Sequence, residues 1–203
     1  MAVVARKPWV GLNYDGLLII GESHYGGPPG ADEDFTVDVV KQVVAGTVRH
    51  RLFTEVACVV TGKPSQEVDR AAFWNGVAFW NFVQRSMHNR PERPRNEDWS
   101  AGRDLFIPVA SSLVPQPHHI LVLGTGKADA KSTYENMPQF DLPDLPSITV
   151  DERDGWPGYY RMAEGKYALT MAISHPRSRG WSWKAWHPLV EAFLAMPNQP
   201  GDD

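Results

Sequence analysis

The sequence has one cysteine, no long apolar run and no excess of positive charge. Cys58 cannot form a disulfide within the chain or a thiolate-rich metal site, and its neighbours in "EVACVVTG" favour a place in the core. No segment approaches the ~20 apolar residues that span a bilayer, so we expect no association with a membrane. Residues 1–16 lack a long apolar stretch followed by a small-residue cleavage site, which favours a cytoplasmic location. No set of histidine and acidic residues has metal-ligand spacing, and we expect neither a metal nor a cofactor.

The charge of the chain is low overall but uneven along its length. A net charge of −4 gives no general attraction to nucleic acid or anionic lipid. Basic residues are nevertheless grouped at 49–51, 90–95 and 175–184. Such a patch can attract phosphate although the total charge is negative, and solvated loops are the alternative interpretation of each. The last stretch, "HPRSRGWSWK", mixes tryptophans with cations, as a surface that stacks on bases would.

The order of apolar segments indicates the fold class. A chain of 203 residues fits a single domain spanning 1–203. Short apolar runs predict strands at 16–20, 77–84, 120–123 and 167–176, with one more at 147–150 inside an irregular excursion at 134–166. Helical spacing predicts helices at 36–46, 51–60, 65–75, 100–113 and 182–195. Strands separated by helices favour a three-layer α/β/α fold with a central four-stranded, mostly parallel sheet.

Polar or glycine-rich residues follow each of the four main strands. They lie at 21–25, at Asn81, at 124–127 and at 174–179. Ligands of open parallel sheets bind beyond the carboxyl ends of the strands. We therefore expect these four segments to meet at one edge of the sheet.

Four motifs at this edge resemble the uracil-DNA glycosylase superfamily. They are "GESHYGGPP" (21–29), "FWNFV" (79–83), "ILVLGTGKA" (120–128) and "ISHPRSRGW" (173–181). In the best known branch of that family the first strand ends in Gly-Gln-Asp-Pro-Tyr-His-Gly-Pro and the last in His-Pro-Ser-Pro-Leu. The likeness extends over about residues 16–195, and it implies a uracil-DNA glycosylase-like fold for a divergent member.

The resemblance also implies roles for individual residues. A base must leave the stack to be processed, so its pocket needs an aromatic wall and an amide that matches the base edge. By resemblance, Phe35 stacks on the base and Asn81 hydrogen-bonds its edge. Gly21 and Tyr25 match the glycine and tyrosine of the first motif, and the tyrosine limits what fits at the ring's 5 position. His175 would stabilise the anionic leaving base.

The same resemblance implies DNA as the partner, as a single strand or with the base flipped out. The segment after the last strand would contact it, with Arg179 at the place of the family's wedge. The further nucleic-acid contacts implied in these motifs are Ser174, Arg177, Ser178 and Lys127.

One departure from the family concerns the attacking water. Ser23 stands where the family has its water-positioning aspartate, so Glu22, Ser23 or His24 would have to handle the water. Loss of a positioned base typically costs about 10²- to 10⁴-fold in rate. Two functions therefore stay open: hydrolysis of the N-glycosidic bond of uracil or another deaminated base, and binding of nucleic acid or a nucleotide without cleavage.

A third interpretation belongs to another class of enzyme. "GES" after an early strand resembles the Gly-Asp-Ser of SGNH hydrolases, with Ser23 as the nucleophile and His187 of "WHP" as its base. Lys184 occupies the position of the orienting carboxylate. Structural roles are the simpler alternative for single residues: Phe35 in the core, Asn81 as a hydrogen-bonding group at a strand end.

Overall fold

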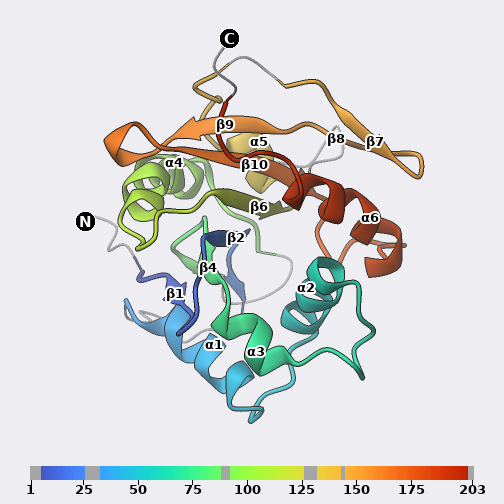
Figure 1. Ribbon diagram of the computed structural model, residues 1–203. Helices are drawn as coiled ribbons and strands as arrows, with labels where there is room; N and C mark the ends of the chain where they lie inside the picture. Colours follow the sequence, from blue (N-terminus) through green and yellow to red (C-terminus); the bar gives the residue numbers. More distant parts are fainter. Residues whose placement is uncertain (1–5, 26–32, 88–91, 126–131, 143–144, 201–203) are drawn as a thin grey trace.

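A six-stranded, mostly parallel sheet lies between two layers of helices (Figure 1). The structure, a computed structural model, describes residues 6–25, 33–87, 92–125, 132–142 and 145–200. The strand order is β1-β4-β2-β6-β10-β9. These strands are β1 (Trp9–Val10), β2 (Leu17–Gly21), β4 (Ala78–Asn81), β6 (His119–Leu123), β9 (Gly158–Arg161) and β10 (Tyr167–Ile173).

The parallel part of the sheet consists of the four main strands predicted from the sequence. β4, β2, β6 and β10 are neighbours in that order, and every residue of β2 and β6 is buried. Strands covered on both faces need continuous apolar runs, which is the pattern that predicted them. In register, Gly21 pairs with Asn81 and Leu123 with Ile173. The carboxyl ends of the four strands are therefore level at one edge, as expected.

The central sheet has six strands and not the four that we expected. β1 pairs antiparallel with β4, and β9 pairs antiparallel with β10. β9 lies in the stretch 134–166 that we expected to be largely irregular, and burial of Tyr159 and Tyr160 on its two faces anchors it. The strand expected at 147–150 is confirmed as β7 (Ile148–Val150), which forms a separate hairpin with β8 (Arg153–Gly155).

Alternate residues of the strands face the two helical layers. On one face, Ile19, Phe79 and Leu121 pack with residues of α1 (Phe35–Val44), α2 (Arg51–Thr61), α3 (Arg70–Asn75) and α6 (Trp183–Leu194). On the other face, Leu18 and Trp80 pack with residues of α4 (Asn96–Ser111). A short helix, α5 (Thr133–Asn136), follows β6. None of the described helices is long and apolar enough to cross a lipid bilayer.

Two predicted helix starts differ from the structure. α3 begins at Arg70 and not near Ser65, because Asp69 accepts a hydrogen bond from the Ala72 N–H and caps the helix there. α4 begins at Asn96 and not at the expected Ser100, since the Asp98 carboxylate accepts a hydrogen bond from the Arg95 N–H. Capping in the first turn therefore sets both boundaries.

Candidate functional site

Gly21 and Asn81 form the first part of the site, at the paired ends of β2 and β4. Asn81 is buried, and its side chain lies across Gly21. A Cβ at position 21 would lie 2.3 Å from Asn81 Oδ1 and 3.0 Å from Phe79 Cζ. Only glycine leaves room for the amide in this place.

His24 lies against this amide. Asn81 Nδ2 is 2.8 Å from His24 Nε2 and 3.1 Å from Nδ1, and Thr36 Oγ1 is 2.9 Å from Nε2. The ring of Phe35 meets the His24 ring edge to face, with centroids 4.8 Å apart. His24 is 8% exposed and Asn81 4%. The fold therefore brings together four residues expected in the site: Gly21, His24, Phe35 and Asn81.

The environment of His24 keeps its ring neutral. Burial and, to a smaller extent, the charge of Arg6 together lower the pKa of His24 to about 3. The Arg6 guanidinium lies 5.2 Å from the centroid of the Phe35 ring. An imidazole with so low a pKa is a weak base, and its Nε2 already faces Asn81 and Thr36. We therefore assign His24 to the packing of the site and not to activation of water.

Gln84 contacts the backbone of Asn81, and Arg6 contacts Gln84; no sequence pattern pointed to either residue. The Arg6 N–H donates to Gln84 Oε1 at 2.6 Å, and Gln84 Nε2 donates to the Asn81 carbonyl oxygen at 2.5 Å. Arg6 Nη2 donates to Ser86 Oγ at 2.9 Å, and the indole of Trp80 donates to the Arg6 carbonyl. Because 78 positions of sequence separate Arg6 from Gln84, no local pattern links them.

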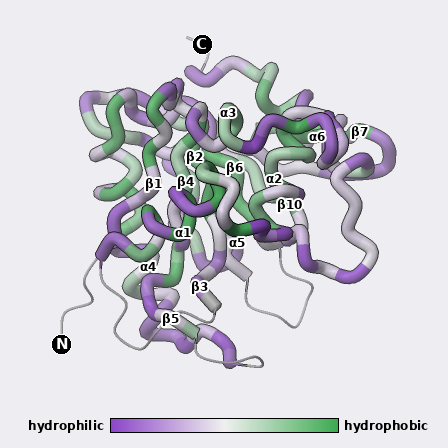
Figure 2. The backbone as a smooth tube through the Cα atoms, turned by 90° about the horizontal axis from the view of Figure 1, so that it is seen from below, coloured by the Kyte–Doolittle hydropathy of each residue, from purple (hydrophilic) through white to green (hydrophobic). Residues whose placement is uncertain are grey.

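A second short sheet carries His24. β3 (His24–Tyr25) runs parallel to β5 (Ser86–Met87), with His24 beside Ser86. Figure 2 shows these two strands together at one side of the molecule, beyond the hydrophobic central strands. The side chain of Tyr25 lies outside what the structure describes, so its expected role stays a prediction.

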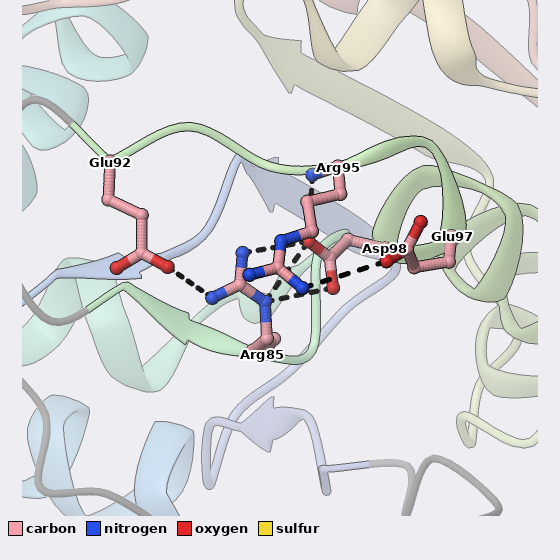
Figure 3. A network of polar contacts seen from close by, with 5 residues as sticks. All are labelled: Arg85, Glu92, Arg95, Glu97 and Asp98. Atoms are coloured by element: carbon pink, nitrogen blue, oxygen red, sulfur yellow. Dashed lines mark hydrogen bonds and ion pairs between the residues drawn. The ribbon is translucent and has the colours of Figure 1, made fainter.

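An ion-pair network fixes the chain around β5 (Figure 3). Arg85 binds both oxygens of Asp98, with Nε 3.0 Å from Oδ1 and Nη2 2.9 Å from Oδ2. Arg85 also pairs with Glu92, and Arg95 lies 3.8 Å from Glu97. Within the basic stretch at 90–95, Arg95 therefore has an acidic neighbour in Glu97, which weakens its expected role in attracting phosphate. Arg90 lies outside the described residues.

The ends of β6 and β10 form the other part of the site. The Gly124 N–H donates to the Ile173 carbonyl, and the hydroxyls of Thr125 and Ser174 are 3.2 Å apart. His175 is half-buried, and its Nδ1 accepts a hydrogen bond from the Arg177 N–H at 3.2 Å. In the neutral ring this leaves the proton on Nε2, which makes Nε2 a donor.

Exposed residues, two of them arginines, come after His175 and Pro176. Arg177, Ser178 and Arg179 are exposed. Burial lowers the pKa of His50, and the charge of Arg177 lowers it too, which places Arg177 near the start of α2. Lys184 Nζ lies 5.7 Å from the centroid of the Trp183 ring, so a cation and an indole are adjacent here, as the sequence suggested. Lys127 lies outside the described residues.

Glu22 and Ser23 come after β2 and are half-buried. The Glu22 carbonyl accepts a hydrogen bond from the Val83 N–H. Ser23 Oγ is buried and has no hydrogen-bond partner in the part of the chain that the structure describes. His187 Nδ1 instead donates to the Val59 carbonyl of α2 at 2.9 Å. The serine–histidine pair that an esterase needs is therefore not formed.

No group of three or more histidine, cysteine or acidic residues that could hold a metal ion occurs in the described ranges. Comparison with protein-family models, curated proteins and solved structures finds no match to this chain.

Proposed function

We propose that this protein recognises a nucleobase of DNA at the carboxyl edge of its sheet and hydrolyses the N-glycosidic bond of uracil or another deaminated base. The observation that carries the proposal is that Phe35 and Asn81 both contact His24 beside Gly21 at the end of β2. β2 lies in the same row of parallel strands as β10, which His175 follows. The motif resemblance to uracil-DNA glycosylases supports the same function.

The two parts of the edge suit the two needs of the reaction. An aromatic ring and a fixed amide can hold a flat heterocycle by stacking and hydrogen bonds. β2 and β6 separate β4, which ends at Asn81, from β10, so β4 and β10 lie about 14 Å apart at a spacing of ~4.8 Å. A base over the end of β2 would then lie between Asn81 on one side and a side chain from the end of β10 on the other.

The proposed chemistry is displacement at the sugar carbon. The oxygen of a water molecule bonds to C1′, the C–N bond breaks, and its electron pair leaves with the base. One proton of the water passes to solvent and the departed base takes up a proton, so that the products are a sugar with a hydroxyl at C1′ and the free base. The Nε2–H of His175 would donate to the oxygen on which that charge develops, which is worth about 10²- to 10³-fold in rate for one such donor. Glu22 and Ser23 are the polar residues available to orient the water at the end of β2.

Binding without cleavage is the second candidate, and two observations favour it. Ser23 stands where the resemblance expects an aspartate, and His24 is too weakly basic at neutral pH to replace one. Recognition of the base is common to both candidates.

The test uses 5′-labelled oligonucleotides that carry one uracil, hypoxanthine or xanthine. After incubation and alkali treatment, a gel shows whether the strand breaks at the modified base. We expect breakage by the wild type and at least a roughly 100-fold slower reaction for His175→Ala. The control is His118→Ala, at the opposite edge of the sheet beside Gly16, which should cut at the wild-type rate.

Each other outcome decides against part of the proposal. If His175→Ala cuts as fast as the wild type, the role of His175 is wrong. Should the wild type cut nothing but bind single strands with an affinity that falls as salt rises, the non-catalytic function holds. Neither cleavage nor binding would overturn both.

A further inference from the structure

The space between Asn81 and Phe35 is occupied by the imidazole of His24. One ring nitrogen of His24, Nε2, lies 2.8 Å from Asn81 Nδ2 and 2.9 Å from Thr36 Oγ1. The ring also meets Phe35 at an interplanar angle of 74°. The two residues that we propose for recognition of a base therefore both contact a heterocycle of the protein itself.

The contacts of this imidazole are those that a nucleobase needs. Imidazole is a flat nitrogen heterocycle, equal in size to the five-membered ring of a purine. It receives an amide N–H, faces a hydroxyl and packs against an aromatic ring, and in its neutral form it carries no charge, like a base. Gln84 bonds to the backbone of Asn81, and Arg6 lies beside the Phe35 ring. Neither contact involves the ring that lies between Asn81 and Phe35.

We propose that His24 is an internal ligand that fills the nucleobase site, and that a base enters by displacing it. This inference rests on the proposed recognition of a base at Asn81 and Phe35. His24 then sets a threshold for binding, because the affinity for any base is reduced by the fraction of molecules in which the ring has left.

The local structure allows the ring to leave. β3 consists of two residues and pairs only with the two residues of β5 among the described strands, so little ordered backbone depends on it. His24 is 8% exposed, and Phe35 is half-buried, so the site is close to the surface. Segments with few backbone bonds open locally at lower cost than the core does.

Removal of the imidazole should therefore tighten binding. We would measure the Kd of the wild type and of His24→Ala for a fluorescent single-stranded oligonucleotide with one uracil, by anisotropy at fixed salt. Displacing the ring costs its contacts with Asn81 and Thr36, so His24→Ala should bind about tenfold more tightly. His24→Ala combined with Asn81→Ala should lose this gain, since the receptor amide is then missing.

Two further variants provide a second test and a control. Thr36→Val removes one contact of the ring without opening a cavity, so it should bind more tightly than the wild type by a smaller factor. If His24→Ala shows no cooperative thermal transition and is therefore not folded, Thr36→Val tests in its place whether His24 is an internal ligand. His119→Ala removes the other histidine that is buried among the described residues, at the opposite edge, and should bind within about twofold of the wild type.

The measurements distinguish failure of the inference about His24 from failure of the proposed function. If folded His24→Ala, or Thr36→Val in its place, binds the oligonucleotide as well as or less well than the wild type, His24 is not an internal ligand, while the proposed function stands. If no protein in the set binds any oligonucleotide, the proposed function is wrong, and this inference with it.

Discussion

The two halves of the strand edge differ in how tightly they are packed. At β2 and β4, the side chains of His24, Thr36 and Asn81 are all buried, and those of Thr36 and Asn81 both contact His24. At β6 and β10, Ser174 and His175 are half-buried, and exposed residues come after them. Both halves belong to one row of parallel strands, so the sheet alone does not cause the difference.

The segments after the strands cause the difference. After β2 the chain forms β3, and α1 then places Phe35 and Thr36 against His24. After β10 the chain passes through turns, of which residues 177–180 are exposed, before α6 begins. We call the half at the ends of β2 and β4 the closed half, and the half at the ends of β6 and β10 the open half. We infer that the closed half holds the base and that the open half presents His175 and cations to the DNA.

The largest expected effect comes from an added methyl group in the closed half. In Gly21→Ala the new Cβ would lie 2.3 Å from Asn81 Oδ1, so the amide and β4 must shift. Overpacking of this kind costs about 3 kcal/mol, and we expect that loss in the free energy of unfolding measured with urea. Binding of oligonucleotides should fall with it.

Gly124→Ala is the matched change in the open half. There the new Cβ would meet Thr133 Oγ1 at an ordinary 3.5 Å, and the cost arises from a φ of +126° that L residues rarely adopt. We expect a loss of about 1–2 kcal/mol and no change at Asn81. Equal losses for the two variants would mean that the halves are packed alike.

Acid should destabilise the protein through its buried histidines. Burial, together with the charge of Arg6, lowers the pKa of His24 to about 3, and burial, together with His118, lowers that of His119 to about 4, from an ordinary 6.5. Below pH 6.5 the unfolded chain binds protons that the folded chain does not, so stability falls with pH until the folded pKa is reached. Each histidine contributes about 2 kcal/mol of this loss between about pH 7 and 5.

The two histidines can be separated by substitution. His24→Ala should show about half of the pH dependence that the buried histidines give the wild type, and His119→Ala the other half, as measured by urea unfolding at each pH. An unchanged slope in His24→Ala would show that its ring is solvated, which contradicts a closed half.

A smaller effect concerns the network that supports β5. Arg85→Ala leaves the Asp98 carboxylate, 9% exposed, without its bidentate cation, and we expect a loss of about 2 kcal/mol at most. Arg95→Ala breaks only an exposed pair with Glu97 and should change stability by less than about 0.5 kcal/mol. Thermal unfolding of the two variants measures the difference. If both lose the same, the network does not anchor this half.

The parallel strands could be predicted because their apolar runs are continuous, as in Leu17–Gly21 and His119–Leu123. β1 was missed because two residues carry no pattern. β9 was missed because Gly158–Arg161 lies among prolines, aspartates and glycines, which favour turns. A strand that joins a sheet at its edge is fixed by pairing and burial more than by its own composition.

The site was predictable in its position but not in its packing. Strand ends in a parallel sheet must meet, and so Gly21, Asn81 and His175 could be placed at one edge from the sequence. Which ring would fill the space beside Asn81 depends on how the chain after β2 folds back. That depends on the contact of His24 with Thr36 and on the contact of Phe35 with Arg6, which no strand pattern in the sequence indicates.

The central claim is that a base binds in the closed half of this edge, and photocrosslinking tests it most directly. A single-stranded oligonucleotide with one 5-iodouracil would be bound, irradiated and digested with the protein, and the modified peptide sequenced. We predict attachment at Phe35, His24 or His175. Attachment at the opposite edge, near His118, or only in the exposed residues of α4, would contradict the claim.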